Sequence, residues 1–269
     1  MSGFTLTLKA APALRLDLRG LTPTALAALG AAEVAKLPIG HGNALVPLAE
    51  FFTVAPRSDD TLLLQGDLSR CDFIGWQMDG GTLIAEGAVG DYAGGAMKAG
   101  TLSVKGRAGE LAACEMAGGT LTIEGDVGDF AASALPGSMD GMRGGTLIVG
   151  GNAGARFGDR MRRGTALIFG DAGDFLASRL VAGSIALAGR AGAHVGYGMR
   201  RGSIVFAGPA PELSATFVPA VADAPVFWQL LSRDLARHGG AFGSLASRSF
   251  DRHLGDVAAL GKGELIVVR

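Results

Sequence analysis

The 269-residue sequence is poor in several residue types on which binding and catalysis commonly depend. Its two cysteines, Cys71 and Cys114, are too few for a disulfide framework, an iron–sulfur cluster or an all-cysteine zinc site. Only 6% of the residues are aromatic and the net charge is −1, so we expect no surface for nucleic acid. No apolar run approaches the roughly 18 residues of a membrane-spanning helix, and residues 1–9 do not have the pattern of a signal peptide. A cytoplasmic location is therefore expected.

Side chains for metal or acid–base chemistry are also sparse. The histidines are spread along the chain without metal-ligand spacing, and the serines lack a G-x-S-x-G context. Four carboxylates, Asp91, Glu110, Asp129 and Asp174, recur at one position of a repeated pattern along the chain, and we expect them to be solvated or paired with neighbouring segments. The sequence thus predicts no catalytic, cofactor-binding or metal-binding residue. The side chains considered are His41, His194, His238, His253, Ser133, Ser138, Ser178, Asp91, Glu110, Asp129 and Asp174.

Glycine, in contrast, is abundant at 44 residues, and between residues 60 and 208 it marks a repeat. Each copy has an opening glycine, then threonine or serine, a short apolar segment and two further glycines. The step between opening glycines is 19 residues, except for one of 26 residues. A fixed period of this length indicates stacked supersecondary units. The opening glycines are Gly81, Gly100, Gly119, Gly145, Gly164, Gly183 and Gly202.

The third and fifth residues of each copy are apolar, an alternation typical of a half-buried strand. One strand per copy, stacked in register, predicts an all-β fold, a parallel β-helix of about seven coils. Like residues then form columns, including a hydroxyl column that starts at Thr82. We expect the second and third glycines to lie at corners, with positive φ or close approach of coils, rather than to cradle a phosphate. A column of long apolar side chains is expected to fill the interior: Met78, Met97, Met116, Met142, Met161, Leu180 and Met199.

The sequence on either side of the repeat predicts two caps. Residues 1–59 predict a small α/β cap, with a strand over 4–8, a helix that begins at Thr22-Pro23, a turn over 39–43 and extended chain over 44–48 and 51–54. Residues 209–269 predict a helix from Pro225 to Arg237, capped by Asp223, and a strand over 263–269. We expect the apolar face of this helix to cover the open C-terminal end of the stack. That face consists of Phe227, Leu230, Leu231 and Leu235.

Basic residues end several copies, and the 26-residue copy contains an insert over 134–140. Stacking places the basic residues along one edge, where guanidinium groups could contact an acidic partner or a polycarboxylate carrier. The alternative is a solvated edge neutralised by the acidic column. The insert should protrude from the stack, and it is our first choice for an interface. The candidate contact residues are Arg143, Arg162, Arg163, Arg200 and Arg201, with Lys98 and Arg160 nearby and Val181 interrupting the column.

The repeat resembles the G-x-x-G-x-x-x-G repeat of the C-terminal domain of glutamate synthase large subunits, a right-handed β-helix. Together with Leu37–Val54 before it, and with the Pro225 helix and residues 261–264 after it, the whole chain resembles the C subunit of formylmethanofuran dehydrogenase. A bacterial relative of that family belongs to the formyltransferase/hydrolase complex. The resemblance implies a right-handed β-helix that serves as a scaffold without an active centre of its own.

The same resemblance implies amidohydrolase-like, formyltransferase and dehydrogenase-B-like partner subunits, which hold the metal ions. Such a complex moves a formyl group from formyl-tetrahydromethanopterin to a methanofuran-type carrier and releases formate. We favour this bacterial complex because an arginine-rich, lysine-poor composition is typical of a GC-rich bacterial genome. The alternatives are the C subunit of a tungsten or molybdenum formylmethanofuran dehydrogenase, and a glutamate synthase-like binding module.

Overall fold

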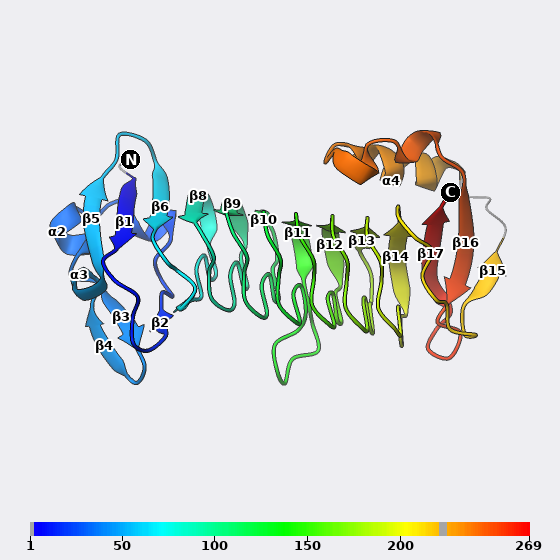
Figure 1. Cartoon of the computed structure of the whole chain (residues 1–269), viewed down its shortest axis with the longest axis horizontal. Coiled ribbons are helices and arrows are strands. Elements are labelled where there is room, and N and C mark those ends of the chain that lie inside the picture. Colours follow the sequence, from blue (N-terminus) through cyan, green and yellow to red (C-terminus); the bar gives the residue numbers. More distant parts are fainter. Residues whose placement is uncertain (1–2, 221–224) are drawn as a thin grey trace.

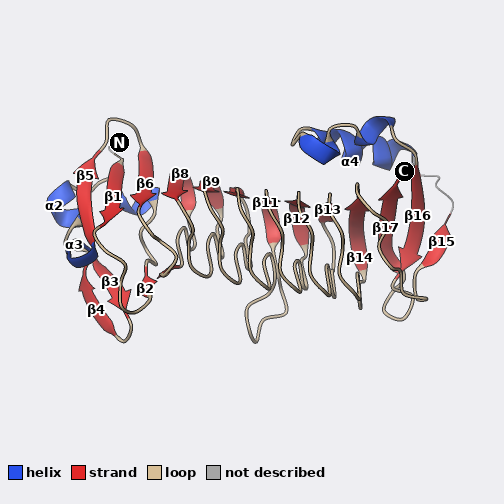
Figure 2. Ribbon diagram, viewed as in Figure 1, coloured by secondary structure: helices blue, strands red, loops and turns tan. Residues whose placement is uncertain are grey.

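The structure, a computed structural model, describes residues 3–220 and 225–269. Its centre is a row of short strands along the long axis of the molecule (Figure 1). Strands and short helices lie at the N-terminal end of the row, and helix α4 (Pro225–Ala236) lies near the other end (Figures 1 and 2). The strands of the row are β6 Thr61–Gln65, β8 Asp79–Glu86, β9 Ala99–Val104, β10 Thr120–Ile123, β11 Arg143–Val149, β12 Arg163–Ile168, β13 Ser184–Leu187, β14 Arg201–Phe206 and β17 Lys262–Val268.

Neighbouring strands of the row are parallel and pair in register. Thr101 of β9 lies beside Thr82 of β8 on one side and beside Thr120 of β10 on the other. Isolated bridges, such as that between Ala153 and Ala172, form a second parallel column. Each coil therefore contributes one main strand and one bridge, which is consistent with a parallel β-helix. Within residues 3–220 and 225–269, the row belongs to a mainly parallel sheet of 13 strands.

The N-terminal part extends this large sheet and adds a four-stranded one, both counted within the described residues. Strand β1 pairs in parallel with β6 and antiparallel with β5, so the two strands cover the N-terminal end of the row. The elements are β1 Phe4–Leu8, β2 Leu16–Asp17, α1 Pro23–Leu26, α2 Ala31–Val34, β3 Pro38–His41, β4 Ala44–Pro47, α3 Leu48–Phe51, β5 Phe52–Pro56 and β7 Cys71–Asp72.

The sequence predictions in this part are confirmed for the first strand, the first helix and the extended chain, and the predicted turn is wrong in extent. The strand over 4–8 is β1, and the hydroxyl of Thr22 accepts a hydrogen bond from the backbone N–H of Ala25 (3.3 Å) at the start of α1. The predicted turn over 39–43 is instead a hairpin in which β3 pairs with β4. The extended chain predicted over 44–48 and 51–54 corresponds to β4 and β5, and the short helix α3 between them, which begins at the fully buried Leu48, was not predicted.

The C-terminal end is closed by strands. The predicted final strand is β17, which pairs in parallel with β14 and continues the row; β16 (Phe250–Gly255) and β15 (Val218–Ala220) then follow antiparallel. The chain from α4 to β16 passes through two short 3₁₀ helices, η1 Gly240–Phe242 and η2 Leu245–Ser247. Because β17 occupies the edge of β14, no helix is needed to cover that edge.

Helix α4 confirms the predicted helix, but its predicted position is wrong, and of its predicted apolar face only Leu235 and, in part, Leu231 are buried. It lies over the outward face of the sheet (Figure 1), where Trp228 and Leu235 pack with Leu167 and Val205 in a second hydrophobic cluster. The predicted contact residues Phe227 and Leu230 are 40% and 65% exposed, whereas Leu231 is partly buried in the cluster. The expected cap, Asp223, lies outside the described residues.

The interior of the stack confirms the methionine column. All seven of its side chains are fully buried. The opening glycines are required twice over: Gly145 has a φ of +83°, and a Cβ at that position would lie 2.7 Å from the carbonyl oxygen of Gly119 and 2.9 Å from the Cε of Met116. The second and third glycines also serve close approach, since a Cβ on Gly128 would lie 2.8 Å from the carbonyl carbon of Gly109. Close approach of neighbouring coils thus requires both kinds of glycine, and the opening glycines additionally have positive φ.

One column that the sequence did not predict has positive φ at side chains other than glycine. Tyr92 (φ 63°) and Phe130 (φ 59°) are examples, and each donates its backbone N–H to a carbonyl of the next coil, at 2.8 and 2.9 Å. The left-handed conformation is unfavourable for such residues, so these contacts between coils must hold it. The column consists of Phe73, Tyr92, Leu111, Phe130, Arg156, Phe175 and His194.

Candidate functional site

An open groove of about 460 Å³ lies along one edge of the stack. Three of its arginines begin strands: Arg143 in β11, Arg163 in β12 and Arg201 in β14. Arg162 and Arg200 come directly before two of these strands, each following a buried methionine. Because that methionine points into the core, the next residues reach the surface. The groove is lined by Arg143, Arg162, Arg163, Val181, Ala182, Arg200, Arg201 and Leu260.

The groove is strongly basic. All five arginines are exposed, and Arg162 forms an ion pair with Asp140 of the insert. Among residues 3–220 and 225–269, Arg143, Arg163, Arg200 and Arg201 have no carboxylate partner. A guanidinium group binds a carboxylate through two parallel hydrogen bonds. Several such groups in one groove suit a ligand or protein surface that carries several carboxylates.

The structure thus brings together the five arginines that the sequence selected. Lys98 and Arg160, which the sequence placed nearby, do not line the groove. Val181, predicted to interrupt the column, lies in the groove wall. Leu260 was missed because it comes from the C-terminal part, after a long excursion of the chain, and no repeat pattern connects it to the column.

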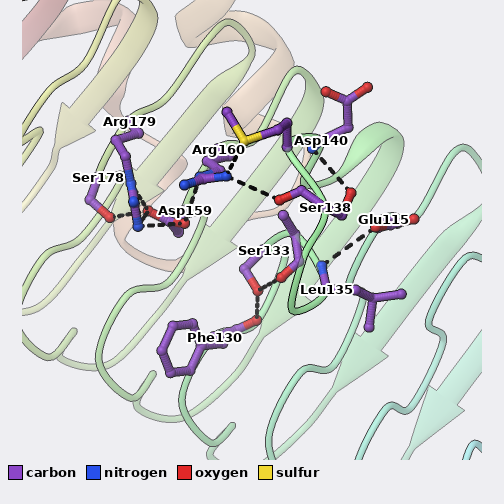
Figure 3. Close-up of polar contacts among 12 residues, drawn as sticks. Glu115, Phe130, Ser133, Leu135, Ser138, Asp140, Asp159, Arg160, Ser178 and Arg179 are labelled. Atoms are coloured by element: carbon purple, nitrogen blue, oxygen red, sulfur yellow. Dashed lines mark hydrogen bonds and ion pairs between the residues drawn. The ribbon is translucent and has the colours of Figure 1, made fainter.

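The insert over 134–140 protrudes from the stack between β10 and β11, and its polar contacts hold it in place (Figures 1 and 3). Arg160 donates a hydrogen bond to the carbonyl oxygen of Ser138 (3.0 Å). The Glu115 carboxylate accepts one from the backbone N–H of Leu135 (3.4 Å). The insert leaves Met139 63% exposed. Its backbone is therefore fixed while an apolar side chain faces outward.

The acidic column has a structural role in the coils. The Asp129 carboxylate accepts a hydrogen bond from the backbone N–H of Ala155 (2.7 Å), and that of Asp174 accepts one from Ala193 (2.8 Å). Asp91 does the same for the backbone N–H of Glu110 (2.9 Å). Each aspartate thus satisfies a donor of the next coil. The three aspartates of the column therefore have a structural role, which refines the expectation that these groups are solvated or paired.

The serines also have structural partners. Ser133 and Ser178 are fully buried; the first donates its hydroxyl hydrogen to the carbonyl of Phe130 and the second donates to the carboxylate of Asp159. The hydroxyl of Ser138 accepts from the backbone N–H of Asp140 (3.3 Å). Each serine stabilises local chain geometry.

Neither a metal site nor a reactive thiol is present in the described part of the chain. Residues 3–220 and 225–269 contain no group of three or more His, Cys, Asp or Glu side chains that could hold a metal ion. Burial raises the thiol pKa of both Cys71 and Cys114 to about 12, so neither forms a thiolate near neutral pH. Within the same residues, no helix is long and apolar enough to cross a membrane.

The fold and the groove together define a class: a stacked, mainly parallel β-sheet protein with a basic edge. The chain is similar to a chain in the crystal structure of the formyltransferase/hydrolase complex from Methylorubrum extorquens, in complex with methylofuran. The identity is 42%, the TM-score is 0.91, and 98% of each chain is covered. The protein belongs to the family formed by the C subunits of this complex and of formylmethanofuran dehydrogenase.

Shorter matches agree with this family. The C subunit of the Methylorubrum extorquens complex is 43% identical over 76 residues, which are 28% of this chain and 29% of that protein. The C subunit of molybdenum-containing formylmethanofuran dehydrogenase 1 from Methanothermobacter thermautotrophicus is 36% identical over 90 residues, 33% of this chain and 22% of that protein. The chain therefore spans less than a third of these curated relatives in the matched segments. No family model matches it.

Proposed function

We propose that this chain is a non-catalytic scaffold subunit of a formyltransferase/hydrolase complex. That complex transfers a formyl group from formyl-tetrahydromethanopterin to a methanofuran-type carrier and releases formate. The observation that carries the proposal is the 42% identity and TM-score of 0.91 over 98% of both chains to a chain of such a complex. The structural roles of the acidic column and the buried serines support a scaffold. The formylmethanofuran dehydrogenase alternative rests on shorter matches at lower identity.

The finer description of the scaffold is part of the proposal. We infer a right-handed parallel β-helix of about seven 19-residue coils over 60–208, with an N-terminal cap over 1–59 and a C-terminal cap over 209–269. The partners are amidohydrolase-like, formyltransferase and dehydrogenase-B-like subunits, which carry the metal ions and both carriers. This chain itself holds no cofactor. A cytoplasmic location stays a prediction of the sequence.

Copurification tests the proposal. The chain, tagged at one terminus and expressed from its own locus, should copurify with the three partner subunits, and the purified assembly should release formate from formyl-tetrahydromethanopterin. Omitting this chain from a coexpressed set should separate the partners on size-exclusion chromatography. A tagged chain that elutes as a monomer free of these subunits contradicts the proposal, and partners with molybdenum or tungsten favour the dehydrogenase.

The groove supports a second function within the same complex, the binding of an acidic carrier or partner surface. Four of its five arginines have no carboxylate partner in the described residues, and the fifth has one that is itself exposed. Because several guanidinium groups in one groove suit a ligand with several carboxylates, a carrier with an acidic tail is the first ligand to test. A fluorescein-labelled hexaglutamate peptide, titrated in low salt, is the probe.

Replacing Arg162, Arg163, Arg200 and Arg201 by alanine should weaken hexaglutamate binding at least tenfold, because each lost guanidinium contact costs about 0.5 kcal/mol or more in an exposed groove. A control variant removes four exposed arginines that do not line the groove and should bind within about twofold of the parent. Equal affinity of the groove variant and the parent contradicts this function. The control replaces Arg107, Arg190, Arg233 and Arg237 by alanine.

A further inference from the structure

The basic groove has an internal carboxylate at its edge. Asp140, the last residue of the insert, forms an ion pair with Arg162, and within residues 3–220 and 225–269 no other carboxylate is paired with a groove arginine. Asp140 lies one 19-residue step before Asp159, so the two aspartates occupy the same position in successive coils. Asp140 belongs to the insert and contacts Arg162 of the groove, whereas Asp159 belongs to a copy without an insert and is bound by Arg179.

The two aspartates differ in how tightly they are held. Asp159 is 5% exposed, accepts two hydrogen bonds from the guanidinium group of Arg179 (2.9 and 3.0 Å) and accepts one from Ser178, so it is a fixed part of the coil (Figure 3). The side chains of Asp140 and Arg162 are 40% and 45% exposed. Exposed ion pairs are weak, since water and salt screen them. An incoming carboxylate can therefore displace Asp140, whereas Asp159 cannot be displaced without disrupting the coil.

The insert positions Asp140 without using its carboxylate. The hydroxyl of Ser138 accepts a hydrogen bond from the backbone N–H of Asp140 (3.3 Å), and the guanidinium group of Arg160 holds the carbonyl of Ser138 (3.0 Å; Figure 3). Glu115 holds the other end of the insert through the N–H of Leu135 (3.4 Å). The backbone of Asp140 thus stays beside the groove whether or not its side chain contacts Arg162.

We propose that Asp140 competes with the ligand of the groove for Arg162. The inference rests on the proposed binding of a polycarboxylate in the groove. Exchanging Asp140 for one ligand carboxylate leaves the number of ion pairs at Arg162 unchanged, so a single carboxylate gains nothing there. A polycarboxylate gains at the four unpaired arginines and tolerates this exchange. Asp140 therefore lowers affinity for every acidic ligand and makes binding depend on contacts at the remaining arginines.

The test is a set of titrations of the full-length chain with labelled hexaglutamate. Asp140→Asn should tighten binding about two- to fivefold, which is the range expected from freeing one exposed ion pair. In the Arg162→Ala background the same substitution should change the dissociation constant by less than about 1.5-fold, because the competed group is absent. Asp234→Asn, which removes the exposed carboxylate paired with Arg237 on α4, is the matched control and should leave binding unchanged.

The outcomes separate the inference from the function on which it rests. If the four-arginine groove variant weakens binding but Asp140→Asn equals the parent, the competition is refuted and the groove stands. Equal tightening by Asp140→Asn with and without Arg162 also refutes it, since the effect is then general repulsion. If neither the groove variant nor Asp140→Asn changes binding, the groove is not the binding site, and the proposed binding of a polycarboxylate fails while the scaffold function stands. Matching circular dichroism spectra establish that each variant is folded.

Discussion

Replacing Met142 by alanine should destabilise the coil stack by about 2–5 kcal/mol. The side chain is fully buried, and its Cε would lie 2.9 Å from a Cβ on Gly164 of the next coil. Alanine lacks the three heavy atoms beyond Cβ. At about 0.8 kcal/mol per buried methylene-sized group, the lost free energy of burying these atoms is about 2.5 kcal/mol. The rest comes from the cavity, which cannot collapse because the backbones on both sides are joined by strand pairing.

The assay is guanidinium unfolding followed by circular dichroism, with Met139→Ala as the control. Met139 lies three residues away on the insert and is 63% exposed, so the same substitution there should change stability by no more than about 0.5 kcal/mol. Hydrogen exchange should locate the loss in β11 and β12, because each unit of a stacked repeat contacts its neighbours. Equal destabilisation by Met139→Ala and Met142→Ala would refute the assignment of this column to the interior.

Further predictions concern the corners, α4 and the thiols. Gly128→Ala should cost about 1–3 kcal/mol in urea unfolding, because its methyl group would meet the backbone of the preceding coil. Gly30→Ala, where no atom lies closer than 3.5 Å, should cost less than about 1 kcal/mol, the loss expected when alanine replaces glycine as the N-cap residue of α2. Phe242→Ala should increase protease cleavage around α4 while the circular dichroism of the coils stays native, because Phe242 is fully buried in the cluster beneath that helix; unchanged cleavage would count against that packing. Cys71 and Cys114 should resist Ellman's reagent at pH 8 in the native protein and react after unfolding, since burial raises both thiol pKa values to about 12. Rapid reaction of the native protein would contradict their burial, and thiolate formation at high pH should favour the unfolded chain.

Much of the central stack could be predicted because its information is local and repeated. Equal spacing of glycines predicts register, and register predicts the columns, such as Thr82 beside Thr101. The fixed step between copies also predicts the basic groove, because it places the arginines of successive copies side by side, as the structure shows for Arg143 and Arg163 on neighbouring strands. When a residue type recurs at a fixed step, all its copies occupy equivalent positions in successive coils, so its chemistry indicates whether that position is buried or exposed.

The position of α4 could not be derived in the same way. Helical spacing allows one apolar stripe through Phe227 and Leu230 and another through Trp228 and Leu235. The structure buries the second, because the outward face of the sheet offers apolar side chains such as Leu167 beneath it. Which stripe is buried depends on a surface assembled from distant segments, and the helix sequence alone does not contain it.

The sequence by itself determined the period, the parallel pairing, the methionine interior and the arginine edge, because each follows from residues that repeat at a fixed step. Only the tertiary structure decided the left-handed conformation of residues such as Tyr92, the place of α4, and the contact of Asp140 with Arg162. These features depend on hydrogen bonds and packing between coils or between distant segments. An interaction that occurs once leaves no periodic trace in the sequence.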